Sequence, residues 1–413
     1  MYKGAMMIKV ASITKLENGS IVTPKGFSAI GTANGLKKEK KDLGAIVCDV
    51  PASCAAVYTT NQIQAAPLQV TKDSITAEGK LQAIIVNSGN ANACTGMKGL
   101  QDAYEMRALG AEHFGMKENY VAVASTGVIG VPLPMDIIRK GVATLIPTKE
   151  ESEAYCFSEA ILTTDLIMKE TCYEMIIDGK KVAIAGVAKG SGMIHPNMAT
   201  MLSFITTDAH IEHDVLQTAL SEITNHTFNQ ITVDGDTSTN DMVIVMASGL
   251  SETRPINMEH TDWETFVCAL QQVCEDLAKK IAQDGEGATK LIEVNVLGAQ
   301  TNEEAKKIAK QIVGSSLVKT AIHGEDPNWG RIISSIGQSE VAIHPNTIDI
   351  TLQSISVLKN SEPQIFSEEE MKERLQEDEI VINVYLHLGE ETGSAWGCDL
   401  SYEYVKINAC YRT

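Results

Sequence analysis

The sequence has few basic residues and no closely spaced pair of cysteines. Its 413 residues contain 34 lysines and arginines against 53 aspartates and glutamates, a formal charge of −19. Nucleic acids and anionic membranes bind clustered cations, so neither is expected as a partner. The nine cysteines never occur as C-x-x-C and their number is odd, which argues against a disulfide framework and against a zinc ribbon.

Long hydrophobic runs are missing as well. The first nine residues include no apolar core of the length that a signal peptide needs. Two uncharged stretches, Asn119–Met135 and Gly190–Thr207, contain proline and glycine among polar residues, so neither is typical of a membrane-spanning helix. We therefore expect a soluble, cytoplasmic protein whose thiols are reduced.

The signatures of common cofactors and nucleophiles are also absent from the sequence. It has no Walker phosphate loop, no complete G-x-G-x-x-G after a strand and no G-x-S-x-G elbow. The stretch from Asp234 begins like a calcium loop but lacks the glycine and the glutamate that such a loop requires. The nine histidines have no metal-ligand spacing, so we expect no metal and no nucleotide cofactor.

Hydrophobic patterning predicts an α/β protein. Runs that are apolar throughout indicate strands buried on both faces, and apolar residues three and four apart indicate amphipathic helices. The expected strands are Leu43–Val50, Leu81–Val86, Tyr120–Ala124, Lys181–Val187, Met201–Thr206, Met242–Ala247, 291–297, Leu317–Ile322, 347–352 and 379–388. The expected helices are Gln101–Phe114, Ser152–Leu162, His213–Asn225, Thr261–Gln283 and Asn302–Ile312. A lobe boundary is expected near 285–290, and the run Lys37–Lys41 is interpreted as a solvated loop.

The segment from Ala188 to Leu202, AKGSGMIHPNMATML, follows one expected strand and leads into another. Its two glycines and its proline indicate a sharply folded loop. On pattern alone, the favoured interpretation is an ordinary connection between strands. The alternative is a catalytic loop with Thr200 as nucleophile. Threonine needs a base to remove its proton, and its own α-amine can serve once the bond after Ala199 is cut.

The motif K-G-S-G-M-I-x-P-N-M-A-T-M-L in this loop resembles the self-cleavage signature of the ornithine acetyltransferases, arginine-biosynthesis enzymes of the N-terminal-nucleophile type. Further blocks resemble the same family: Asn87–Gly96, Ser125–Gly130, Ile161–Asp165, Asp234–Asp241, Asp284–Lys290, Gly324–Arg331 and Asn408–Thr413. One departure is Leu166, where the family commonly has threonine. The resemblance implies a cut between Ala199 and Thr200, which divides the chain into residues 1–199 and 200–413.

The resemblance also implies roles for individual residues. Thr200 takes acetyl from N-acetylornithine as an ester and passes it to the amine of glutamate. Thr126 and Gly127 match the oxyanion-hole position, where a strand end can aim a hydroxyl and a backbone N–H at one point. The implied substrate-binding residues are Thr163, Lys189, Thr200, Glu286, Asn408 and Thr413.

Without the resemblance, Lys189 and Glu286 would ordinarily be taken as surface charges. Three aspartates near the middle of the chain are interpreted as turn and hydrogen-bonding residues rather than as catalysts: Asp234, Asp236 and Asp241. Ornithine brings a cationic side chain to the pocket and glutamate an anionic one. We therefore hypothesise that Asn408 and Thr413 contact these side chains. The terminal carboxylate of Thr413 would pair with the cationic side chain of ornithine.

The resemblance implies the architecture and the assembly too. The expected fold is α/β, an αββα layered sandwich of the self-processing N-terminal-nucleophile kind with a smaller C-terminal α/β lobe. Residues 1–285 would form the catalytic domain and 286–413 the lobe, whose tail returns to the active site. We expect a heterotetramer of two α and two β chains that performs ping-pong transfer without a cofactor, with acetyl-CoA as a further co-substrate.

Within the family, the sequence leaves open a monofunctional form, which uses only N-acetylornithine as donor, and a bifunctional form, which also uses acetyl-CoA. Two interpretations outside that choice remain open as well. The first is a related self-processing aminopeptidase or amidase, in which water replaces glutamate as the acceptor. The second is an uncut, non-catalytic acidic binding protein. Transfer of acetyl to glutamate distinguishes the acetyltransferase from the hydrolase. The mass of the denatured chain distinguishes these two self-cleaving enzymes from the uncut binding protein.

Overall fold

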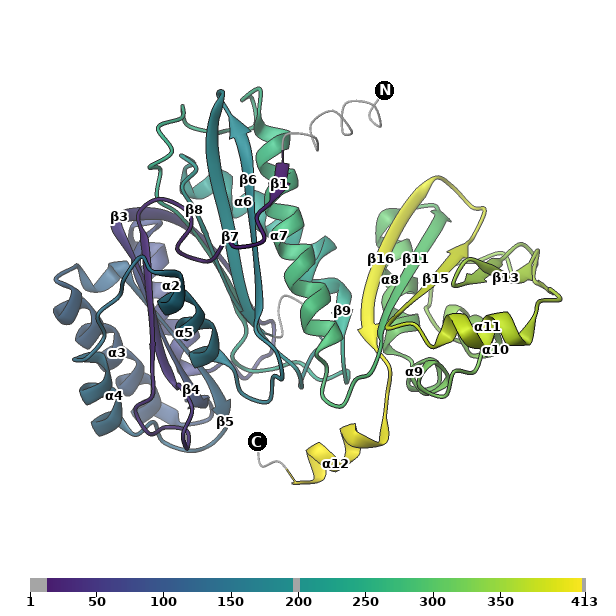
Figure 1. Ribbon diagram of the computed structural model, residues 1–413, viewed down its shortest axis with the longest axis horizontal. Coiled ribbons are helices and arrows are strands. Elements are labelled where there is room, and N and C mark those ends of the chain that lie inside the picture. The colour runs from purple at the N-terminus through teal and green to yellow at the C-terminus, as the bar shows by residue number, and fades with distance from the viewer. Residues whose placement is uncertain (1–12, 196–200, 411–413) are drawn as a thin grey trace.

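The computed structural model describes residues 13–195 and 201–410 of the chain, arranged around two β-sheets (Figure 1). The larger sheet has the order β1-β6-β7-β8-β10-β3-β4-β5, with β2 beside β3. Its strands are β1 (Ile13–Lys15), β2 (Phe27–Thr32), β3 (Leu43–Tyr58), β4 (Lys80–Asn90), β5 (Val121–Val128), β6 (Lys169–Ile177), β7 (Lys180–Lys189), β8 (Leu202–Thr207) and β10 (Met242–Ala247).

Helices cover both faces of the larger sheet, because its central strands are apolar on both sides. In β10, Val243 and Val245 pack with helices α6 (His213–His226) and α7 (Trp263–Gln283). Ile244 and Met246 pack instead with α5 (Glu151–Ile161). The expectation that Met242–Ala247 is a strand buried on both faces is therefore confirmed. Three further helices adjoin the end of the sheet near β4 and β5: α2 (Ala66–Glu78), α3 (Gly96–Phe114) and α4 (Met135–Val142).

The second sheet has the order β14-β13-β12-β15-β11-β16-β9 and a hydrophobic core of its own. Its strands are β9 (Ile231–Thr232), β11 (Leu291–Ala299), β12 (Asp349–Leu352), β13 (Ile355–Lys359), β14 (Glu362–Pro363), β15 (Glu379–Tyr385) and β16 (Glu391–Cys398). Its helices are α8 (Asn302–Gly314), α9 (Ser316–His323), α10 (Trp329–Gly337) and α11 (Glu368–Leu375). Strand β9 pairs in parallel with β16, so a short piece of chain from before residue 285 completes this sheet.

The run Leu317–Ile322 is helical, and the expectation of a strand there is wrong. It belongs to α9, whose first turn is capped by Ser315: the hydroxyl accepts a hydrogen bond from the backbone N–H of Val318 at 3.4 Å. Val318, Ala321 and Ile322 are buried at spacings of three and four, which is helical spacing. An apolar run of six residues is too short to distinguish a strand from a buried turn of helix.

The C-terminal helix α12 (Tyr402–Cys410) leaves the second sheet and runs back beneath the larger one (Figure 1). None of its residues is buried, and its sequence neighbour Ser401 donates a hydrogen bond to the carbonyl of Gly287. Residues near the end of the chain therefore lie beside the segment that follows α7. Within the described ranges, no helix combines the length and the apolarity needed to cross a membrane.

Candidate active site

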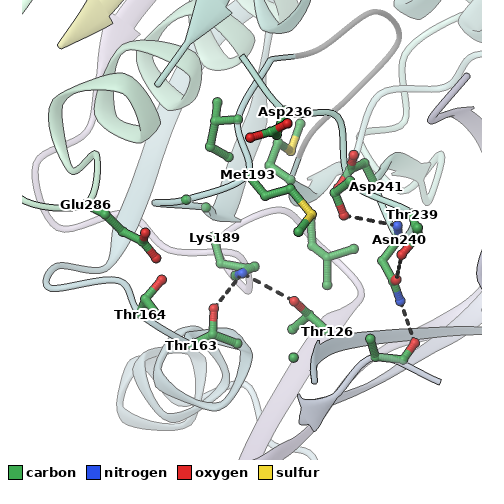
Figure 2. A pocket seen from close by; sticks show the side chains of 18 of the residues that line it. Thr126, Thr163, Thr164, Lys189, Met193, Asp236, Thr239, Asn240, Asp241 and Glu286 are labelled. Carbon is green, nitrogen blue, oxygen red and sulfur yellow. Dashed lines mark hydrogen bonds between the residues drawn. The ribbon is translucent and has the colours of Figure 1, made fainter. Parts of the chain in front are cut away.

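A cavity of about 190 Å³ lies where β5 and β7 end and where the segment after α7 meets α12. Six of the predicted site residues line it: Thr126, Gly127, Thr163, Lys189, Glu286 and Asn408. They come from five separate segments of the chain, and Figure 2 shows several of them around Lys189. The remaining predicted residues, Ala199, Thr200 and Thr413, lie outside the described residues.

The ammonium group of Lys189 occupies the middle of the cavity. It donates hydrogen bonds to the hydroxyl of Thr163 at 2.8 Å and to the hydroxyl of Thr126 at 3.3 Å (Figure 2). Burial lowers the pKa of Lys189, while the Asp165 carboxylate, 3.9 Å away, acts in the opposite direction. The cavity thus contains a desolvated cation with two hydroxyls beside it, an arrangement suited to binding a carboxylate.

A network of buried ion pairs adjoins the ammonium of Lys189. Lys169 lies 2.8 Å from Asp165 and 2.6 Å from Asp284. Asp165 also accepts a hydrogen bond from the backbone N–H of Gly190 at 2.6 Å. Burial alone would raise the pKa of Asp165, but Lys189 and Lys169 together hold it well below its ordinary value. Asp165 therefore stays ionised and fixes the turn that follows Lys189.

Sequence reasoning assigned no role to this network. Asp165 and Asp284 stand in blocks that carried the family resemblance, so those blocks were the signal that could have found them. Lys169 stood in no such block, and a single lysine near a strand start gives no sign that it is buried between two carboxylates.

The Glu286 carboxylate forms another wall of the cavity, because three contacts hold it there. Its backbone N–H donates to the carbonyl of Ser191 at 3.0 Å, and the side-chain amide of Asn408 donates to Oε2 at 2.8 Å. Gly192 packs so closely that a β-carbon there would lie 2.4 Å from the carboxyl carbon of Glu286. Helix α12 thus supplies the cavity with Asn408 and also with Tyr404, which sequence reasoning missed.

Thr126 and Gly127 stand at the end of β5, beside the end of β4. Gly127 has φ +130°, and a β-carbon there would lie 2.4 Å from the carbonyl carbon of Gly89 on the paired strand. The side-chain amide of Asn240 donates to the carbonyls of Ala91 and Ser125, at 2.6 and 2.8 Å, which ties the two strand ends together. This rigid, glycine-dependent strand end faces the cavity, and its role as an oxyanion hole stays a prediction.

The loop after β7 is fixed by Asp234, whose carboxylate accepts hydrogen bonds from the backbone N–H groups of Met193 (2.7 Å) and Ile194 (2.8 Å). That is the hydrogen-bonding role expected of it. Asp241 differs from Asp234 in its hydrogen bonding, because its Oδ2 is buried without a hydrogen-bond partner among the described residues. Burial raises the pKa of Asp241 well above its ordinary value, although Ser238, Lys189 and Met201 oppose the shift.

Over the described ranges, one group of side chains has the composition of a metal site: Asp178, His260 and Asp262. Its carboxylates already have partners. The guanidinium of Arg254 forms an ion pair with Asp178, and Asp262 accepts a hydrogen bond from the backbone N–H of Asp178 at 2.9 Å. None of the three lines the cavity around Lys189.

Comparison with known proteins places these residues in a family. The model of the ArgJ family matches residues 28–413. The chain is 97% identical over 408 residues to the arginine biosynthesis bifunctional protein ArgJ of Bacillus cereus, covering 99% of this chain and all of that protein. It is 64% identical over 406 residues to the protein of the same name from Halalkalibacterium halodurans, covering 98% and 99% of the two chains.

Solved structures give a shorter match. The ornithine acetyltransferase of Mycobacterium tuberculosis, crystallised with ornithine, is 34% identical with a TM-score of 0.43, covering 45% of this chain and all of the solved one. The resemblance drawn from the motif around Thr200 is confirmed by the family match and by the relatives that align along almost their whole length. The chain belongs to the ArgJ family.

Proposed function

We propose that the chain moves the acetyl group of N-acetylornithine to glutamate, giving ornithine and N-acetylglutamate, through an acetyl ester on Thr200. The observation that carries the proposal is the cavity around Lys189. Residues from five parts of the chain meet there: β5, β7, the segment before β6, the segment after α7, and α12. The family resemblance implies a role in this reaction for a residue of each part. Surface charges would have no reason to converge in this way.

The described groups suit the chemistry of the two half-reactions. Both substrates carry an α-carboxylate, which the buried ammonium of Lys189 and the hydroxyl of Thr163 can bind. The carboxylate of Glu286, held by Asn408, can hold an ammonium or orient the attacking amine. Thr126 and Gly127 lie at a strand end where donors can stabilise an oxyanion, an effect worth about 10²–10³ in rate.

Self-cleavage between Ala199 and Thr200 would create the base that this chemistry needs. The Thr200 hydroxyl attacks the carbonyl of Ala199, and the peptide C–N bond breaks as its nitrogen takes up a proton and becomes the new α-amine. Water then hydrolyses the resulting ester, which frees the Thr200 hydroxyl and the carboxylate of Ala199. In transfer, that amine accepts the hydroxyl proton as acetyl is attacked, and it returns a proton to the departing ornithine amine. Among the described residues near the cut, Ile194 and Met201 line the cavity.

Denaturing mass spectrometry tests the cut. We expect two chains, residues 1–199 and 200–413, and a Thr200→Ala variant that stays at full length and transfers no acetyl. Thr200→Ser keeps a hydroxyl and an α-amine, so it should retain part of both activities. A single full-length species with full transferase activity would overturn the proposal.

Acceptor and donor are tested separately. With glutamate present, we expect N-acetylornithine to transfer its acetyl group to glutamate. Without glutamate, we expect little hydrolysis of N-acetylornithine; rapid hydrolysis would identify the aminopeptidase or amidase alternative. We propose that acetyl-CoA also serves as donor, and N-acetylglutamate formed with acetyl-CoA as sole donor would support this.

The remaining expectations are proposals on the same basis. We propose a cytoplasmic heterotetramer of two α and two β chains, with residues 1–285 as catalytic domain and 286–413 as the C-terminal lobe. No metal or resident cofactor takes part in the proposed chemistry. Removing Thr413 should weaken the use of N-acetylornithine more than that of glutamate, and an equal loss would refute its role in binding the cation.

A further inference from the structure

The lysine-rich run Lys37–Lys41 is only partly the solvated loop that its sequence suggests, because its first residue is half-buried. The preceding turn wraps around the buried carboxylate of Asp42. That carboxylate accepts hydrogen bonds from four successive backbone N–H groups, those of residues 34 to 37, at 2.8, 2.9, 2.7 and 3.0 Å. The backbone of Lys37 is therefore fixed, and its side chain leaves the turn in a defined direction.

The side chain of Lys37 spans two walls of the active site. Its ammonium donates a hydrogen bond to the carbonyl of Leu162 at 2.8 Å. Its stem lies against Gly89, where a β-carbon would come 3.0 Å from Cγ of Lys37. Leu162 directly precedes Thr163, the hydroxyl bound to Lys189, and Gly89 is paired with Gly127. One side chain thus links the Thr163 segment to the strand ends that carry the predicted oxyanion hole.

Charges from three elements act on this ammonium. Burial lowers the pKa of Lys37 to about 8. Asp42 from its own turn and Asp165 from the segment after α5 favour the charged form, whereas Lys40 and Lys189 oppose it. Lys41, at the other end of the run, pairs with Glu159 of α5. The charge of Lys37 is thereby sensitive to pH near 8 and to the charges in the cavity.

We propose that Lys37 is a positioning residue of the active site, which holds Thr163 in place against Lys189 through the Leu162 carbonyl and the contact with Gly89. The proposal rests on the proposed function, since it assumes that Lys189 and Thr163 bind substrate. Lys37 touches neither of the two side chains by a hydrogen bond of its own, so it acts on substrate through the Leu162–Thr163 backbone.

The test compares Lys37→Met with Lys38→Met, a neighbouring lysine of the same run that is exposed. Both variants lose one charge, but only the first loses the contact with Leu162. We expect Lys37→Met to be cleaved like the wild type and to raise KM for N-acetylornithine about tenfold, with a smaller fall in kcat. Lys38→Met should stay within about twofold of the wild type, in keeping with the small effects of exposed charges.

Two further variants of Lys37 complete the comparison. Lys37→Arg keeps a charged donor, so its KM should lie much nearer the wild-type value than that of Lys37→Met. If Lys37→Met fails to fold, Lys37→Gln takes its place in the comparison. KM of the wild type should rise more steeply above pH 8 than KM of Lys37→Arg, because residue 37 loses its proton only in the wild type while Lys189 is common to both. Equal KM values in Lys37→Met and Lys38→Met, or an Arg variant no better than Met, would overturn the proposal. A wild type without transferase activity would refute the proposed function instead.

Discussion

The ammonium of Lys169 lies 2.6 Å from an Asp284 carboxylate oxygen, and both side chains are buried. Lys169 begins β6, whereas Asp284 caps α7 two residues before Glu286. The same ammonium binds Asp165, which in turn faces Lys189. This single cation therefore connects the two sides of the cavity around Lys189.

Replacing Lys169 by methionine should destabilise the protein strongly. The variant leaves Asp165 and Asp284 buried together without their cation, and such losses cost about 3–5 kcal/mol. Urea unfolding measures the effect. The control is Lys149→Met, because Lys149 forms an exposed pair with Asp49 and should cost about 0–1 kcal/mol. Similar costs for the two variants would show that the buried pair adds nothing beyond a surface one.

Gly192→Ala should impair substrate binding without unfolding the protein. A β-carbon there would lie 2.4 Å from the carboxyl carbon of Glu286, so the carboxylate must move away from Asn408. A displacement of this size costs about 10²-fold in kcat/KM where a side chain positions substrate. Steady-state transfer kinetics give the result.

The matched control for Gly192 is Gly337→Ala. Gly337 ends α10 and a β-carbon there meets nothing within 4 Å, so alanine should leave the kinetics unchanged. If Gly192→Ala also keeps its kcat/KM, the position of Glu286 does not matter for transfer.

Sequence patterning predicts six of the nine described strands of the larger sheet, because a run such as Met242–Ala247 must bury both faces wherever it lies. It misses β1, β2 and β6. It fails where the signal is short: Leu317–Ile322 has too few residues to show a helical period. It also fails for Lys37, since an isolated charge run is normally solvated and its burial depends on Gly89 and Leu162, which come from distant parts of the chain.

The same limit applies to the active site. Motif resemblance predicts that Glu286 and Asn408 bind substrate, yet they are 122 positions apart and only the fold brings them within 2.8 Å. The partnership of Lys169 with Asp284 spans 115 positions, and Lys169 stands in no block that resembles the family. A motif marks residues that recur for chemical reasons, whereas the residues that hold them in place follow from packing.

Gly127→Ala should abolish most of the transfer activity. Its φ of +130° strains any side chain, and its β-carbon would lie 2.4 Å from the carbonyl carbon of Gly89. The end of β5 must therefore move, which displaces the proposed oxyanion donors and should cost about 10²–10³ in kcat. Gly130→Ala separates the two causes, because Gly130 has φ +79° with nothing within 4 Å of a β-carbon. We expect that control to lose some stability and to keep its kcat.

Asp241→Asn should make the protein more stable at pH 8 than the wild type, with a smaller gain or none at pH 4. Burial raises the pKa of Asp241 in the folded state well above its ordinary value. Folding at neutral pH must then take up a proton or bury a charge. The wild type accordingly loses stability as pH rises above the unfolded pKa of about 4 and toward the folded one, by about 1.4 kcal/mol per pH unit for this group.

Asparagine keeps the shape of Asp241 but does not ionise, so its advantage over the wild type should grow with pH across this range. Urea unfolding at intervals from pH 4 to pH 8 measures the difference for both proteins. Asp236→Asn serves as the control, because Asp236 is an exposed carboxylate of the same loop and its removal should leave the pH slope unchanged. Parallel curves for the wild type and Asp241→Asn would mean that the buried carboxyl folds without taking up a proton. Asp241 would then be an ionised group whose charge is balanced across the cavity by Lys189.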